Sequence, residues 1–171
     1  SMALVALLII TAICLPTPSM AAEGIIVNGT QFKDTSGNVI HAHGGGMIEY
    51  EGYYYWYGEY RDSSNKFLGV RCYRSKDLVN WEYRGEVLSP SSASELASCN
   101  VERPKVMYNA NTKEFVMWMH FEGHNAYKTA EVAYAVSNSI GGNYQFKSHF
   151  RPMGIDSRDI NVYQDDDGKA Y

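Results

Sequence analysis

Short apolar and aromatic runs, each ended by turn residues, recur along the chain after residue 23. The run Met47–Tyr50 is followed by a Glu-Gly turn and by a second run, Tyr53–Tyr57. The same order returns at Val106–Tyr108, a polar turn and Phe115–Met119. Paired runs around a short turn predict antiparallel β-hairpins, whereas the 3.6-residue period of an amphipathic helix is almost absent.

A longer repeat organises these hairpins. Further strands are expected at Arg71–Arg74 and Ala133–Val136, and each is followed by a turn that starts with serine and by an aromatic strand. A third hairpin is expected from Val162, around the turn Asp165–Gly168. The hairpins begin near residues 47, 106 and 162, so four strands recur with a period of roughly 56 to 59 residues.

Four strands per period predict an all-β fold made of β-propeller blades, because a blade is a four-stranded sheet that repeats along the sequence. A β-sandwich, which is also built of short strands, is the alternative. Residues 23–171 suffice for roughly two and a half blades, whereas propellers close with about four or more. We therefore expect this segment to be the N-terminal part of a longer propeller domain.

The first 22 residues have a different character. Ala3–Leu15 is largely apolar, no charge precedes Glu23, and the small residues Ala21 and Ala22 follow. This pattern is typical of a secretory signal peptide, and the run is shorter than the roughly 20 residues that span a bilayer. We predict that residues 1–22 are cleaved and that the protein is secreted or periplasmic. A buried helix and a lipoprotein signal at Cys14 are the alternatives.

Composition narrows the classes of partner. The formal net charge is −4, so the chain lacks the positive field that holds a nucleic acid. Aromatic residues make up 13%, with 14 Tyr among them, which suits either stacked sugars or a β-rich core. Cys72 and Cys99 are the cysteines that follow the predicted signal, and the sequence leaves open whether they form a disulfide.

Three polar residues occupy the same phase of the repeat. His43, Glu102 and Asp159 each lie at the start of the first strand of a hairpin. Because the innermost strands of a propeller line its axis, we expect these residues to converge at one end of the channel. Carboxylates in a concave, tyrosine-rich site suit glycoside hydrolysis, which needs a proton donor and a base or nucleophile. The alternative is that they are solvated residues that merely begin strands.

Several segments carry a family resemblance: His41–Met47, Tyr55–Glu59, Ser75–Trp81, Glu102–Val106, Met117–His120, Asp156–Asp159 and Gln164–Gly168. Together they resemble glycoside hydrolase family 43, and most closely its exo-β-1,3-galactanase branch. The resemblance covers residues 25–171 and implies a five-bladed propeller. It also implies an enzyme without a cofactor that releases terminal galactose from β-1,3-galactan or arabinogalactan-type polysaccharide. A family 43 arabinosidase or xylosidase and a non-catalytic sugar-binding propeller are the alternatives.

The resemblance assigns roles to single residues. It implies that Asp159 tunes the proton donor and orients the sugar, and that Glu102 is a second catalytic residue. Most of the family has a catalytic-base Asp where this chain has His43, and the galactanase branch lacks that Asp too, so the base stays unassigned. The general acid is expected beyond residue 171, so residues 23–171 alone should be inactive. The substrate-binding residues that we expect are His43, Glu59, Arg103 and Tyr127.

We expect no metal ion. His41 and His43 would share one face of a strand, which is a weak signal for a metal pair. Asp165–Gly168 lacks the ligand spacing of an EF-hand loop and is expected to be a hairpin turn. Gly44–Gly46 precedes a strand rather than a helix, so it predicts close backbone packing and not a phosphate-binding loop.

Overall fold

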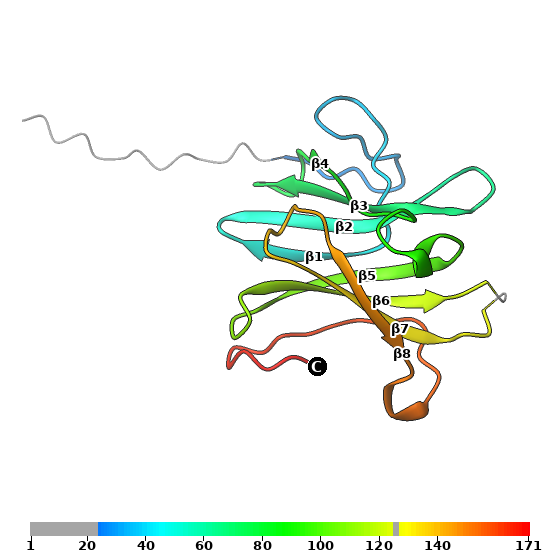
Figure 1. Cartoon of the computed structure of the whole chain (residues 1–171). Coiled ribbons are helices and arrows are strands. Elements are labelled where there is room, and N and C mark those ends of the chain that lie inside the picture. Colours follow the sequence, from blue (N-terminus) through cyan, green and yellow to red (C-terminus); the bar gives the residue numbers. More distant parts are fainter. Residues whose placement is uncertain (1–23, 125–126) are drawn as a thin grey trace, which may run out of the picture.

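In the computed structural model, which describes residues 24–124 and 127–171, the chain forms two four-stranded antiparallel sheets that lie one above the other (Figure 1). The first sheet contains β1 (His43–Tyr50), β2 (Tyr53–Arg61), β3 (Phe67–Ser75) and β4 (Glu82–Leu88) in sequence order. The second contains β5 (Asn100–Asn109), β6 (Glu114–Glu122), β7 (Glu131–Ser137) and β8 (Gln145–Phe150) in the same order. Two short 3₁₀ helices, η1 (Ser94–Leu96) and η2 (Pro152–Gly154), lie in the connections.

The all-β prediction and the four strands per repeat are confirmed. Glu51 and Gly52 form a two-residue turn with φ of 50° and 74°, the conformation that suits the twist of a hairpin. The third hairpin is present as one antiparallel bridge, Gln164 to Ala170, around the expected Asp165–Gly168 turn. The predicted signal peptide, residues 1–22, lies outside the described residues.

Strand alternation places the core between the two sheets. On β2 the side chains of Tyr55 and Tyr57 are buried and join one cluster with Met117 and Met119 of β6. The Tyr57 hydroxyl donates a hydrogen bond of 2.5 Å to the carbonyl oxygen of Ile140, which follows β7, and so links the two sheets. The core therefore belongs to both sheets, because each buries one face against the other.

The two cysteines are free thiols in this structure. Cys72 is buried in the core, and Cys99 is partly buried beside it. Burial raises the pKa of Cys72 to about 12 and that of Cys99 to about 11, since a thiolate loses its hydration there. Neither thiol is activated as a nucleophile.

A polar turn joins β3 to β4. The carboxylate of Asp77 accepts hydrogen bonds from the backbone N–H groups of Val79 (2.9 Å) and Asn80 (2.8 Å) and from the Ser75 hydroxyl (2.9 Å). The Trp81 indole donates to the carbonyl of Leu78 at 3.2 Å. Short polar side chains that bind nearby backbone N–H groups commonly form such turns.

The C-terminal segment runs beside the second sheet and closes one side of an inner cavity. Gln164 donates to the carbonyl oxygen of Tyr108 on β5 at 3.1 Å. A cavity of about 270 Å³ lies between β1, β5 and residues 161–164, with Lys105 in its lining. β1, β5 and the segment that follows the second sheet thus face a common space. None of the helices in the described ranges has the length and apolar character that a bilayer crossing requires.

The outer face of the second sheet carries an apolar hollow of about 320 Å³. Trp118, Val132 and Phe150 line it on the sheet side, and Ile160 and Tyr171 line it on the side of the C-terminal segment. Phe150 and Tyr171 are exposed. This sheet therefore offers a second apolar surface besides the one that packs on the first sheet.

Candidate functional site

Two β-bulges bring the site together where β1 and β5 begin. The register of β1 on β2 shifts between His43 and Gly46, and that of β5 on β6 shifts between Glu102 and Lys105. A bulge turns side chains away from the regular alternation of a strand and is common beside active sites. Both bulges lie at the same end of the stacked sheets, since β1 packs on β5.

The glycines of the first bulge leave room for that contact. Gly44 has φ of +59°, and a Cβ there would lie 2.6 Å from Oε1 of Glu59. A Cβ on Gly46 would lie 2.5 Å from the Lys105 side chain. The Lys105 ammonium donates to the carbonyl oxygen of Gly44 at 2.9 Å and so ties the two bulges together. The predicted close backbone packing of Gly44–Gly46 is confirmed.

Arg103 sits at the centre of the second bulge. Its backbone is left-handed, with φ of +56°, and the next residue is Pro104, which has no N–H to donate to a neighbouring strand. The bulge takes the backbone N–H of Arg103 out of the strand pairing, and this N–H donates to Oε1 of Glu59 at 3.0 Å. The Arg103 guanidinium meanwhile donates to both oxygens of Asp159, at 3.1 and 3.3 Å. A bidentate pair of this kind fixes the orientation of the carboxylate in addition to the attraction between the two charges.

Glu59 lies beneath the surface of the site, with 2% of its side chain exposed. Besides the Arg103 N–H, it accepts a hydrogen bond of 2.7 Å from Nε of Arg61. His43 is largely exposed, and its Nδ1 lies 3.5 Å from Oε2 of the same carboxylate. Glu59 therefore joins β1, β2 and β5 at the floor of the site.

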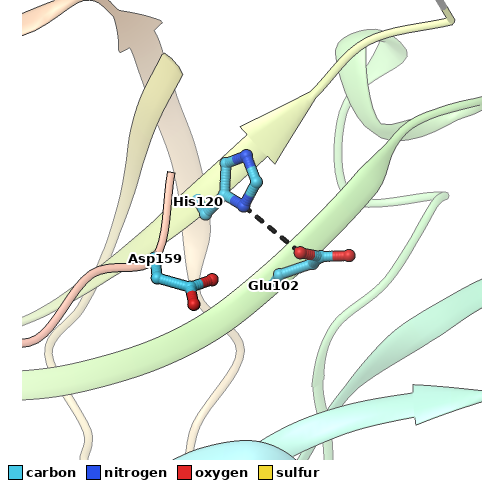
Figure 2. Close-up of side chains that lie close together, drawn as sticks. All are labelled: Glu102, His120 and Asp159. Atoms are coloured by element: carbon cyan, nitrogen blue, oxygen red, sulfur yellow. Dashed lines mark ion pairs between the residues drawn. The ribbon is translucent and has the colours of Figure 1, made fainter. Parts of the chain in front are cut away.

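Glu102 is the carboxylate on which the most groups converge. Arg61 donates to its Oε1 at 3.3 Å, and the Tyr127 hydroxyl donates to the same oxygen. This hydrogen bond, together with burial, raises the pKa of Tyr127 to about 12. His120, directly across from Glu102 on β6, places Nδ1 3.2 Å from Oε2 (Figure 2). Asp159 faces both side chains from the C-terminal segment and is largely exposed.

Behind His120 lies a second, buried carboxylate. Nε2 of His120 lies 2.8 Å from Oε1 of Glu122, and both side chains are nearly inaccessible to solvent. Glu122 also accepts hydrogen bonds from Arg158 (2.8 Å) and from the backbone N–H groups of Thr129 (2.9 Å) and Ala130 (3.2 Å). Burial alone would raise the pKa of Glu122, but these hydrogen bonds outweigh it and lower the pKa.

One ligand atom from each of Glu102, His120 and Asp159 lies within 4.8 Å of the others, a spacing that a metal ion could use. Two guanidinium groups already pair with these carboxylates, Arg61 with Glu102 and Arg103 with Asp159. Each of these two carboxylates thus already has a cationic partner, although Arg61 is shared with Glu59. Fixed carboxylates and guanidinium groups suit a neutral ligand with many hydroxyl groups, which they can bind by directed hydrogen bonds.

The structure thus brings the six expected site residues into one connected network. Glu59, Glu102, Arg103, Tyr127 and Asp159 are linked by hydrogen bonds, directly or through Arg61. His43 lies at the edge of this network, where it approaches only Glu59 among them. The expected convergence of Glu102 and Asp159 is confirmed, and it draws on β5 and on a segment 57 positions later in the chain.

Sequence reasoning missed Arg61, His120 and Glu122. A signal for two of them was present, because His120 and Glu122 directly follow the predicted strand Phe115–Met119 and, if it continues, share a face two positions apart. Polar residues at successive positions of one face of an otherwise apolar strand can mark a buried polar network. Arg61 gave no such signal, since it ends its strand beside a turn.

The comparison with family models matches residues 44–171 to the model described as glycosyl hydrolases family 43. The match spans most of the chain and includes both bulges and the Asp159 segment. The chain belongs to glycosyl hydrolase family 43. No curated protein matched it.

Solved structures of family 43 enzymes are similar to this chain. An exo-β-1,3-galactanase from Clostridium thermocellum is 64% identical over 87% of the chain, with a TM-score of 0.82. An exo-β-1,3-galactanase from Phanerochaete chrysosporium, solved with galactose, is 42% identical over 85% of the chain, with a TM-score of 0.80. A variant of the Phanerochaete enzyme, solved with β-1,3-galactotriose, is 41% identical over 85% of the chain, with a TM-score of 0.81.

The family 43 chain spans only part of these enzymes. It covers 35% of the Clostridium chain and 35% of each Phanerochaete chain. The matched region therefore corresponds to about a third of the length of each relative.

Proposed function

We propose that the parent protein, meaning the protein to which this chain belongs, is an exo-acting glycosidase that releases galactose from the ends of β-1,3-galactan. Arabinogalactan-type polysaccharide is the expected substrate. One observation carries the proposal: the chain is 64% identical, over 87% of its length, to an exo-β-1,3-galactanase. The connected carboxylates and arginines at the end of the stacked sheets support it, because this chemistry suits sugar hydroxyl groups.

Within this proposal, Glu102 and Asp159 are the catalytic residues that this chain contributes. Asp159 is largely exposed but held by Arg103, so it can orient a sugar while it stays in a fixed direction. Tyr127 and Arg103 line the same opening as sugar-binding residues, and Glu59 holds Arg103 from below. His43 binds the sugar at the edge of the site. The general acid comes from a part of the parent protein beyond residue 171.

The proposal includes a five-bladed propeller in which the two sheets are the first two blades. Support comes from three segments, β1, β5 and residues 161–164, which face one cavity as the inner strands of successive blades would. The apolar hollow on the outer face of the second sheet is the surface on which a third blade would pack. Signal-directed export to the periplasm or the exterior also belongs to this proposal, on the ground of the apolar run Ala3–Leu15.

The test compares Glu102→Gln and Asp159→Asn with the parent protein on β-1,3-galacto-oligosaccharides. Each change keeps the shape and removes one charge, so turnover should fall by about 10²- to 10⁴-fold, the range of acid–base machinery. Galactose binding should weaken by no more than about 1.5 to 3 kcal/mol, which one charged hydrogen bond contributes. Rates of galactose release and calorimetric affinities give both quantities.

A matched control is Asp166→Asn, which makes the same chemical change in an exposed turn and should leave both quantities unchanged. Unchanged turnover in both site variants would remove Glu102 and Asp159 from the reaction. A parent protein that binds galactan without cleaving it would be a sugar-binding propeller. Release of arabinose or xylose in place of galactose would assign it another family 43 specificity.

A further inference from the structure

His120 is a buried histidine between two carboxylates. It lies on β6 with about 2% of its side chain exposed. Nε2 faces Glu122 at 2.8 Å, and Nδ1 faces Glu102 at 3.2 Å. Among the described residues Nδ1 has no hydrogen-bond partner, although Oε2 of Glu102 lies within reach of it. Glu102 is therefore the neighbouring group that can serve as a hydrogen-bond partner for Nδ1.

The chemistry of imidazole restricts how this arrangement forms. A neutral imidazole carries a hydrogen on one nitrogen and a lone pair on the other, whereas the imidazolium carries hydrogens on both. Glu122 is ionised and accepts from its other partners, so it requires a donor at Nε2. A lone pair at Nδ1 would then point at the oxygen of Glu102, which is unfavourable in a buried site. Two facing carboxylates thus require hydrogens on both ring nitrogens.

The other charged groups around His120 agree with this assignment. From β2, Arg61 contacts Glu102 on Oε1, which leaves Oε2 to His120. Tyr127 also donates to Oε1 and adds no charge. On the far side, Arg158 balances Glu122. Oε1 of Glu102 therefore has its own donors, and Oε2 faces Nδ1 of His120.

We propose that His120 is a positioning residue for Glu102: its Nδ1–H holds Oε2 of Glu102 toward the sugar, while Glu122 fixes the ring through Nε2. This inference rests on the proposed function for what Glu102 does, and on the geometry of the cluster for how Glu102 is held. It assigns the motif Met117–His120 and the buried Glu122 a part in the site.

Two substitutions of one histidine separate the two ring nitrogens. In His120→Asn the amide nitrogen lies where Nδ1 was and can still donate to Glu102. In His120→Gln it reaches the position of Nε2 and can donate only to Glu122. Galactose release by the full-length parent protein should fall by about 10- to 100-fold in kcat for His120→Gln, the effect of one lost charged hydrogen bond. His120→Asn should stay within about threefold of the wild type, and KM should change little in either.

His149→Asn is the matched control, because this histidine also pairs with a carboxylate, but with Glu131 on β7. It should leave kcat unchanged. A greater loss in His120→Asn than in His120→Gln would overturn the proposal, since a ring that serves only to anchor Glu122 predicts that order. Equal losses in the two variants, or no loss in either, would also overturn it, because the donor at Nδ1 would then make no difference.

Nitrogen NMR of the wild-type protein tests the same proposal without a substitution that endangers folding. Nδ1 of His120 should report a bound hydrogen, and a lone pair at Nδ1 would overturn the assignment. The proposed function fails separately, if the wild type releases no galactose. Galactose affinity then replaces kcat as the readout, and we expect His120→Gln to weaken it more than His120→Asn does.

Discussion

Single residues with unusual backbone conformations determine where the site lies. Arg103 adopts a left-handed conformation that few non-glycine residues take up, and its N–H is thereby aimed at Glu59 rather than at a neighbouring strand. Gly44 has a similar φ on the opposite bulge. The chain accepts local strain at Arg103, whereas Gly44 adopts its conformation without that cost, and two strands thereby approach one buried carboxylate.

A substitution of Gly44 tests this dependence. Gly44→Ala forces a side chain into a left-handed backbone, at a cost of about 1 to 2 kcal/mol. It also places Cβ 2.6 Å from Oε1 of Glu59, so the carboxylate must move. We expect a lower unfolding midpoint and a loss of galactose release of about tenfold or more, since small displacements of reacting groups are costly.

Gly52→Ala is the control for backbone strain alone. Gly52 has φ of +74°, and a Cβ there would meet nothing within 4 Å. This variant should lose stability by the same backbone term and keep its activity. Equal activity of the two variants would show that the approach of Gly44 to Glu59 does not matter for the site.

At the scale of elements, hairpins and turns divide the chain into strands. The turn Ser75–Trp81 reverses the chain between β3 and β4 through hydrogen bonds to Asp77. Hydrogen bonds from the backbone N–H and side chain of Asn80 and from the N–H of Val79 lower the pKa of Asp77 well below its ordinary value. Thr35 also donates its N–H to the carbonyl of Trp81 at 2.9 Å, so the turn anchors the segment before β1.

We predict that Asp77→Ala destabilises the protein by about 0.5 to 2 kcal/mol, the range for a side chain that caps backbone N–H groups. Asp77→Asn should cost less, because one acceptor oxygen remains. A depressed pKa gives stability that is complete above the ordinary value near 4 and is lost as the pH falls through the lower, folded-state value.

Urea unfolding midpoints at several pH values test this prediction. The difference between the wild type and Asp77→Asn should be largest at neutral pH and should shrink below about pH 4. A difference that grows in acid would show that the carboxylate is not stabilised by these N–H groups. Galactose release should be unaffected in both variants, since the turn lies outside the site.

The strands themselves could be predicted because alternation and turn residues are local signals. Tyr53–Tyr57 and Phe115–Met119 are short aromatic or apolar runs bounded by turn residues, and both lie inside observed strands. The third hairpin, read from the same signals, is present as a short pairing around the bridge Gln164 to Ala170, with backbone hydrogen bonds between Tyr163 and Tyr171, rather than as a full strand pair. A strand pair is stabilised by a sheet on which it can pack, and turn residues alone do not supply that surface.

At the scale of the whole molecule, the two sheets bury the apolar faces that they turn toward each other, and the second sheet exposes apolar side chains on its other face. The apolar hollow lined by Trp118, Val132 and Phe150 lies on the face of the second sheet away from the first. The matched region makes up 35% of the Clostridium and Phanerochaete chains, so those enzymes have further chain that could cover such a face. Exposed apolar surfaces of this kind favour self-association.

We predict that purified residues 23–171 release no galactose from β-1,3-galacto-oligosaccharides and associate with one another. The expected general acid is missing, and one sheet face and edge are uncovered. Size-exclusion chromatography with light scattering and a galactose assay measure both effects, with the parent protein at equal concentration as the control. Robust galactose release by this segment would show that the acid is already present in it.

The sequence by itself determined the strands, the repeat of four strands and the residues most suited to bind a sugar. These features depend on neighbours in the chain: alternation, turn residues and motifs such as Glu102–Val106. Such patterns record which side chains face inward but not which strand they meet, because period and spacing carry no information on distant partners.

Only the tertiary structure decided which polar groups share a site. Asp159 reaches Arg103 across 56 positions, and Arg61 reaches Glu102 across 41, because two bulges and the stacking of the sheets bring them together. The buried pair of His120 and Glu122 becomes part of the site for the same reason, since a histidine acquires its role from the carboxylates that surround it. Local sequence cannot specify these contacts, because each is made between strands that are distant in the chain.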